Sequence, residues 1–170
     1  MSQKLVILRG APASGKTTIC KKIRDIDKNI VWLSIDGIKP IFSEYKNETL
    51  EQSNKASLVM LDHLLSEGYS VIYDGIFKIP EHLRQAEEVA RNKDTPFVVY
   101  QLEASLRTLQ EREKVRDGVK HGLWQPLGDD LVASLYQKVQ DNPIEEAIKL
   151  DTENMSLEEC LEVIRKNFEQ

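Results

Sequence analysis

The chain has 170 residues, of which 41% are hydrophobic and 30% are charged, as in an ordinary globular domain. No apolar run approaches the roughly 20 residues that span a bilayer, and the N-terminus has no secretory signal, so we expect a cytoplasmic protein with no membrane segment. The net charge of −5 disfavours long nucleic acid as the main partner, because backbone phosphates call for a basic face.

The first motif follows an apolar run at residues 5–8 and reads Gly10-Ala11-Pro12-Ala13-Ser14-Gly15-Lys16-Thr17. This G-x-x-x-x-G-K-T pattern lies between a predicted strand and a helix predicted over residues 16–25, which is the setting of a phosphate-binding loop. We expect Gly10 and Gly15 to adopt backbone angles that other residues avoid, so that the amide N–H groups of the loop turn toward phosphates.

In such a loop Lys16 would bridge β- and γ-phosphate oxygens, and the Thr17 hydroxyl would ligate Mg²⁺. The helix that follows would add its positive N-terminal end. The residues expected to bind the nucleotide, taken to be ATP, are Gly10, Ala13, Ser14, Gly15, Lys16, Thr17 and Thr18.

Four more apolar runs follow along the chain, at residues 30–35, 70–73, 97–102 and 147–150, and helical patterns separate them. This alternation predicts an α/β domain with a mainly parallel sheet covered by helices on both faces. Helices are predicted over residues 38–45, from a capping box at Thr49 to Gly68, over 80–92, 106–117 and 129–140, and after a capping box at Ser156. No linker is apparent, so residues 1–170 are expected to form one domain.

The second run ends in Ser34-Ile35-Asp36-Gly37-Ile38-Lys39. Open α/β sheets bind ligands beyond the carboxyl ends of their strands. A carboxylate there would accept the proton of a substrate hydroxyl as it attacks the γ-phosphate, and Lys39, one helical turn later, would hold an anionic group of the substrate. The alternative is that Asp36 only caps a short helix and Lys39 is solvated.

The third run ends in Tyr73-Asp74-Gly75. An acidic residue at the end of an apolar strand is the usual second element of a nucleotide site, where it holds Mg²⁺ directly or through water. An Asp-Gly turn is the alternative. We favour a site role for Asp74 and leave open whether it serves the metal or the substrate.

The helix after the fourth run carries Arg112 and Arg116, which are four residues apart and share one face. Two arginines on one face are suited to neutralise a triphosphate as charge shifts toward the leaving group, although Glu111 and Glu113 offer local pairing instead. With the glycine-containing segment behind it, the region from about residue 106 to 128 is predicted to be a helical lid.

On these motifs the chain resembles the small phosphate-loop kinases grouped with polynucleotide 5′-hydroxyl kinase, zeta toxin and chloramphenicol phosphotransferase. The resemblance implies a P-loop NTPase fold with a five-stranded parallel sheet of order 2-3-1-4-5. It also implies that Asp36 is the catalytic base and that Lys39 contacts a phosphate of the substrate. Polynucleotide kinases commonly have Arg where this chain has Lys39, which lacks the bidentate geometry of a guanidinium.

The leading interpretation is therefore an ATP- and Mg²⁺-dependent kinase in which Lys16, Asp36, Arg112 and Arg116 are catalytic. Its acceptor would be a hydroxyl-bearing small molecule or a 5′-hydroxyl nucleic-acid end. The second interpretation is a nucleotide-dependent switch that acts through a protein partner. A guanine-nucleotide switch is disfavoured, because the chain has no Asn-Lys-x-Asp sequence to recognise guanine.

Overall fold

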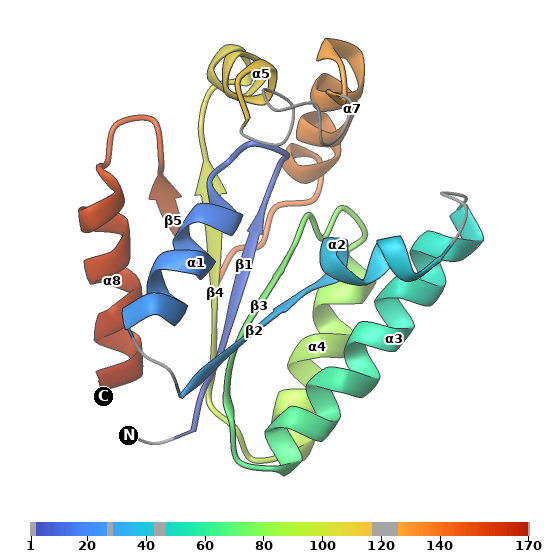
Figure 1. Ribbon diagram of the computed structural model, residues 1–170, viewed down its shortest axis with the longest axis vertical. Helices are drawn as coiled ribbons and strands as arrows, with labels where there is room; N and C mark the ends of the chain where they lie inside the picture. The colour runs from blue at the N-terminus through green and yellow to red at the C-terminus, as the bar shows by residue number, and fades with distance from the viewer. Residues whose placement is uncertain (1–2, 27–28, 43–46, 117–125, 170) are drawn as a thin grey trace.

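The computed structural model describes residues 3–26, 29–42, 47–116 and 126–169. Its five strands form one parallel sheet of order β2-β3-β1-β4-β5, with helices on both faces (Figure 1). The strands are β1 (Leu5–Gly10), β2 (Ile30–Ser34), β3 (Ser70–Gly75), β4 (Phe97–Glu103) and β5 (Ile148–Asp151). The fold class and strand order expected from the sequence are confirmed.

Helices occupy most of the remaining described chain. They are α1 (Lys16–Ile26), α2 (Ile35–Ile38), α3 (Asn47–Ser66), α4 (Pro80–Asn92), α5 (Leu106–Lys114), α7 (Asp129–Gln140) and α8 (Leu157–Glu169), with a 3₁₀ turn η1 (Lys39–Ile41) after α2. None of the described helices combines the length and apolar character that crossing a membrane requires.

The central strand β1 is buried along its whole length, because helices cover the sheet on both sides. Its side chains alternate between two cores: Val6 and Leu8 pack in one, and Leu5 and Ile7 in the other. A strand covered on both faces needs apolar residues at every position, which explains the continuous run in the sequence.

The two cores belong to two pairs of helices. Helices α1 and α8 cover one face, and α3 and α4 cover the other (Figure 1). Helices α5 and α7 pack together beyond the carboxyl ends of the strands, where Leu109 and Val132 are buried against Ala11. The ends of β1, β2 and β3 therefore open toward one region beneath α5 and α7.

Local sequence motifs predicted the start of two helices correctly. Pro80 is the first residue of α4, and at Ser156 the capping box forms, with Ser156 Oγ accepting from the N–H of Glu159 and Glu159 Oε2 accepting from the N–H of Ser156. Other boundaries were wrong: α3 begins at Asn47 and not at Thr49, α5 ends at Lys114, before residue 117, and β5 is shifted by one residue. The helix expected over residues 38–45 is also wrong in its described part, which contains the end of α2 and the 3₁₀ turn η1. Most of the glycine-containing segment at 118–128 lies outside the described residues.

Candidate active site

The phosphate-loop motif forms a turn between β1 and α1 that depends on unusual backbone angles. Gly15 has φ +99° and Ala13 has φ 61°. Gly10 is required for a different reason from the one expected, since its φ is not positive. A Cβ on Gly10 would lie 2.6 Å from Ser14 Oγ and 2.9 Å from the carbonyl oxygen of Leu102, so the loop would have to move.

The Lys16 side chain folds back onto the loop. Its Nζ donates to the carbonyl oxygens of Gly10 at 2.8 Å and Ala11 at 2.9 Å, and to Ser14 Oγ at 3.3 Å. Burial lowers the pKa of Lys16, while the charges of Asp74 and Asp36 act against that effect. The hydrogen bonds of this buried amine go to neutral oxygens, so the site is suited to receive an anion.

Asp36 lies in the short helix α2, directly after β2, and forms an ion pair with Lys39. Burial raises the pKa of Asp36, but the charge and hydrogen bond of Lys39, with smaller contributions from Lys16 and Arg116, leave that pKa below its ordinary value. Half of the Asp36 side chain is still exposed, so its carboxylate is ionised and accessible.

Asp74 is the second-to-last residue of β3 and is buried, 2% exposed. Its Oδ1 accepts a hydrogen bond of 2.7 Å from Trp32 Nε1, a residue of the neighbouring strand β2. Burial raises the pKa of Asp74, and hydrogen bonds from Trp32 and Ser34 and the charge of Lys16 oppose that rise. Asp74 thus lies behind the loop and near Lys16, and its assignment to metal or substrate stays a prediction.

Arg112 lies in α5, but Arg116 follows two residues after the helix ends at Lys114, so the expectation that both arginines lie on one helical face is wrong. Both residues line the same cavity, and they have different partners. Arg112 Nη2 donates to the carbonyl oxygen of Thr152 at 2.7 Å, and its Nη1 donates to Thr152 Oγ1 at 3.2 Å. Arg116 pairs with the buried Glu113 at 2.9 Å, so local pairing with a glutamate does occur. The two arginines are thereby tied to the protein at the edge of the site.

One open cavity of about 1470 Å³ brings these groups together. Its walls include residues 12–19 of the loop and α1, Asp36 with Lys39, and both Arg112 and Arg116. Of the predicted site residues, Gly10 and Asp74 do not line it, because Gly10 supports the loop from β1 and Asp74 is buried behind Lys16. The carboxyl ends of β1 and β2 and the helix α5 thus converge on one space.

Several residues of this region had no signal in the sequence. Thr152 enters from the segment after β5 and anchors Arg112, and its hydroxyl donates to the Glu103 carbonyl oxygen at 3.0 Å. His82 of α4 and Glu51 of α3 approach to 3.1 Å on the cavity wall. These contacts join residues far apart in the chain, which local patterns do not reveal.

Arg9 is a further residue that the sequence did not single out. It is fully buried and donates from Nε to the Phe77 carbonyl oxygen at 3.3 Å and from Nη2 to those of Val139 at 3.1 Å and Asn142 at 2.6 Å. It also donates to the Gln101 side chain. Arg9 therefore fixes α7 and the segment after β3 relative to the phosphate loop.

The residues present fit ATP and Mg²⁺. Lys16 Nζ donates to carbonyl and hydroxyl oxygens of the loop, and phosphate oxygens would replace them. A hydroxyl at Thr17 and a carboxylate at Asp74 are oxygen ligands of the type that Mg²⁺ prefers. No cluster of three or more His, Cys, Asp or Glu side chains occurs in the described part of the chain, so a metal held by protein ligands alone is not indicated there.

Comparison with known proteins gives one family and several relatives. A family model described as an AAA domain matches residues 5–122, more than half of the chain. L-seryl-tRNA(Sec) kinase of Methanococcus maripaludis is 27% identical over 138 residues, which cover 79% of this chain and 51% of that protein. The chain therefore spans about half the length of this curated relative.

Solved structures share the fold over most of the chain. The APS kinase CysC of Mycobacterium tuberculosis, in complex with AMPPNP and APS, superposes with a TM-score of 0.71 at 16% identity and covers 99% of each chain. A chain of the Pnkp1/Rnl/Hen1 RNA repair complex gives a TM-score of 0.64 at 20% identity, covering 88% of this chain and 50% of that one. The fold is that of the P-loop kinases, as the sequence resemblance implied.

Proposed function

The chain belongs to the AAA domain family whose model it matches, and we propose that it is a Mg²⁺-dependent kinase that transfers the γ-phosphate of ATP to a hydroxyl group. One observation carries the proposal: Lys16 of the phosphate loop and the ionised, half-exposed Asp36 line the same cavity. Lys16 would bind the phosphate donor, and Asp36 would act as the base for the hydroxyl of the phosphate acceptor. The kinase relative supports the same reaction class.

On the donor side, the loop amides and Lys16 bind the β- and γ-phosphates of ATP. Lys16 exchanges the carbonyl oxygens of Gly10 and Ala11 for phosphate oxygens. Thr17 and, directly or through water, Asp74 would hold Mg²⁺. When bound, the ion offsets the negative charge of the phosphate oxygens and helps to orient them.

On the acceptor side, Asp36 accepts the proton of the substrate hydroxyl. The hydroxyl oxygen forms a bond to the γ-phosphorus, the bond from that phosphorus to the β–γ bridging oxygen breaks, and ADP leaves. Lys39 keeps Asp36 ionised before the reaction and would also contact an anionic group of the substrate. A positioned base of this kind contributes roughly 10²- to 10⁴-fold to the rate.

Arg112 and Arg116 would stabilise the charge on the transferring phosphoryl group. Arg112 lies in α5 and Arg116 just after it, both within the segment of about residues 106–128 that we propose as a lid. Arg112 donates hydrogen bonds to Thr152. To contact a triphosphate, its guanidinium must either bind Thr152 and the phosphate together or adopt a new rotamer. The proposal includes a single domain over residues 1–170 and a cytoplasmic location.

The acceptor is a hydroxyl-bearing small molecule or a 5′-hydroxyl nucleic-acid end. The similar proteins offer both kinds of context, since one is an APS kinase in complex with APS and another is part of an RNA repair complex. The net charge of −5 favours the small molecule.

The test measures ADP release from Mg²⁺-ATP in the presence of nucleosides, sugars, phenicol- and aminoglycoside-type compounds and 5′-hydroxyl oligonucleotides. We expect at least one compound to raise ADP release and to gain a phosphoryl group detectable by mass spectrometry. ATP hydrolysis that no hydroxyl compound stimulates, together with a stable protein partner, would instead identify a nucleotide-dependent switch.

A further inference from the structure

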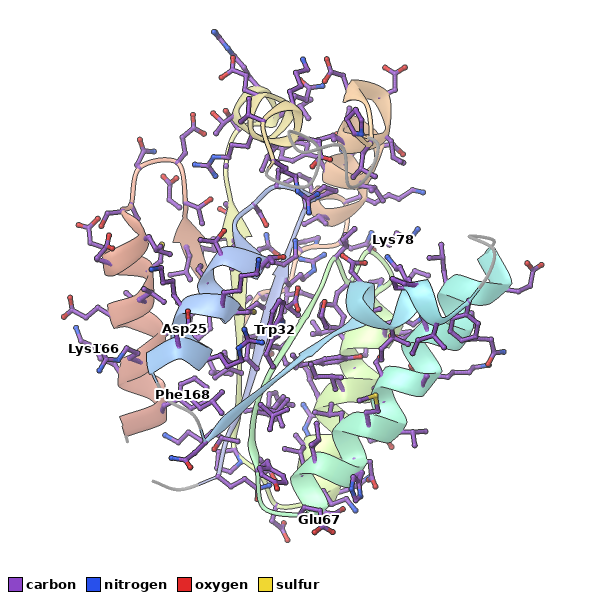
Figure 2. The ribbon with its side chains drawn as sticks, in the orientation of Figure 1. Asp25, Trp32, Glu67, Lys78, Lys166 and Phe168 are labelled. Atoms are coloured by element: carbon purple, nitrogen blue, oxygen red, sulfur yellow. The ribbon has the colours of Figure 1, made fainter. Side chains whose placement is uncertain are left out.

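Lys78 is a cation on the cavity wall for which the described residues provide no ion pair or hydrogen bond. It lies between α2 and α7 (Figure 2), where the positive charges of Lys138 and Lys39 act on it. Asp36 and Glu51, two carboxylates that line the same cavity, have other partners, since Asp36 pairs with Lys39 and Glu51 contacts His82. Burial and the two neighbouring lysines lower the pKa of Lys78, so an anion at this point would be stabilised.

The segment that carries Lys78 is held in place. Phe77 has φ 47°, an unfavourable angle for a non-glycine residue, and its carbonyl oxygen accepts from the buried Arg9. Its ring packs edge-on against Tyr73 with centroids 5.4 Å apart. Lys78 therefore projects from a fixed backbone, which is what a binding residue requires.

The wall of the same cavity also has apolar residues. Ile79, Leu127 and Leu131 line the cavity although 44%, 39% and 45% of each is exposed. Large apolar side chains that are exposed together at a cavity are typical of a ligand-binding surface. They would pack against a hydrocarbon or planar group of a bound molecule.

Asn54 is a buried polar residue of the same cavity. It is 1% exposed, it lines the cavity, and its Oδ1 is buried without a hydrogen-bond partner among the described residues. A buried carbonyl without a donor is unfavourable.

We infer that this part of the cavity binds a small acceptor that carries an anionic group at Lys78 and an apolar or planar body against Ile79 and Leu131. That the bound molecule is a phosphate acceptor rests on the proposed kinase function, whereas the binding of an anionic small molecule at this site does not. The cavity of about 1470 Å³ exceeds the roughly 300–1,000 Å³ of a single small-molecule pocket, which leaves room for a second small molecule beside ATP.

The test uses phenyl phosphate, which combines a planar body with a phosphate and has no alcohol to react. It is titrated by calorimetry into the full chain saturated with Mg²⁺ and AMPPNP, so that the phosphate loop is already occupied. We expect phenyl phosphate to bind more tightly than phenol or inorganic phosphate alone. Binding no tighter than that of phenol would overturn the inference.

The Lys78→Met variant should weaken phenyl phosphate binding by about tenfold or more and leave phenol binding unchanged. Lys138→Met is the matched control, because Lys138 lies near Lys78 but is not among the described residues that line the cavity. Equal losses in both variants, or none in Lys78→Met, would contradict a specific site. Thermal unfolding of each variant checks that it is folded.

Two further arms define the ligand class. Leu131→Ala should weaken phenyl phosphate but not inorganic phosphate, and an unchanged affinity would remove the apolar contact from the account. Comparison of benzoate with phenyl phosphate tells a carboxylate from a phosphate site, and preference for either supports the inference. A 5′-hydroxyl hexanucleotide that binds far more tightly than a mononucleotide, with a steep salt dependence, would overturn the small-molecule assignment.

These binding measurements are independent of phosphoryl transfer. If Lys78→Met abolishes phenyl phosphate binding while no hydroxyl compound raises ADP release, the anion site is supported and the kinase proposal fails. If an acceptor is phosphorylated equally well by wild type and Lys78→Met, the kinase proposal is supported and the anion site fails.

Discussion

Asp36 and Lys39 form an ion pair at the cavity wall, and this pair predicts how activity depends on pH. A carboxylate base works only when ionised, and Lys39 lowers the pKa of Asp36 below its ordinary value of 3.8. In Lys39→Met the pKa of Asp36 should rise, because burial then acts with less opposition. The acid limb of the pH profile of kcat/KM for ADP release should therefore move to higher pH.

The control for that shift is Lys93→Met, which breaks a 3.2 Å ion pair with Asp62 outside the cavity. It should leave the acid limb where it is in the wild type. An unchanged acid limb in Lys39→Met would mean that Lys39 does not set the ionisation of the base.

Trp32 supports Asp74 through a hydrogen bond to a buried carboxylate. Trp32→Phe keeps an aromatic ring beneath Arg24, whose guanidinium carbon lies 5.4 Å from the ring centroid, but removes the N–H donor. The free energy of unfolding should fall by about 1–3 kcal/mol. Urea denaturation of the single variants Trp32→Phe and Asp74→Asn and of the double variant measures the coupling, and strictly additive losses would deny the interaction.

At the scale of elements, α5 carries Arg112 at the cavity, ends two residues before Arg116, and is capped at its start by Ser105. Ser105 Oγ accepts from the N–H of Thr108 at 3.3 Å. Ser105→Ala should cost about 0.5–2 kcal/mol and let the start of α5 fray. Hydrogen exchange should then show lower protection in α5, and ADP release should fall because Arg112 and Arg116 are less well placed.

The matched variant is Ser156→Ala, which removes the cap of α8 at a similar cost. Helix α8 packs beside α1 on the far side of the sheet from α3 and α4, and none of the four proposed catalytic residues belongs to it (Figure 1). Equal losses of ADP release in the two variants would show that α5 has no special part in the site.

Sequence patterns predicted a helix or strand well where a single property of the residues decides the local structure. Pro80 starts α4 because its missing N–H costs nothing at the first helical position, and the continuous apolar run of β1 predicted a strand buried on both faces. The reason given for Gly10 was wrong, since the close approach of β4 at Leu102, and not a positive φ, excludes a side chain there. That contact exists only after the sheet has formed.

For the whole molecule, the strand order is the one that the family resemblance implied. The predicted site residues Lys16, Asp36, Arg112 and Arg116 line one cavity. The residues that complete the cavity were not predictable from sequence. Thr152, His82 and Lys78 gain their significance from partners or neighbours that are distant in the chain, and no local pattern distinguishes them from ordinary surface residues.

Binding of ATP should stabilise the whole fold. A ligand that binds only the folded state at a concentration of 100 Kd adds about 2.7 kcal/mol to the free energy of unfolding, which raises Tm. Lys16→Ala should lose most of this rise, because Lys16 is the buried cation of the phosphate loop. Thermal unfolding with and without Mg²⁺-ATP measures the effect, and an undiminished rise in the variant would contradict the assignment of the loop.

The central claim is that Asp36 is the base of a phosphoryl transfer that starts from ATP in the phosphate loop. Its most direct test measures ATP affinity and acceptor-stimulated ADP release in Asp36→Asn, which retains the shape of the side chain and removes its charge. We predict wild-type ATP affinity with ADP release reduced by roughly 10²- to 10⁴-fold. Acceptor-stimulated ADP release near the wild-type rate in Asp36→Asn would contradict the claim.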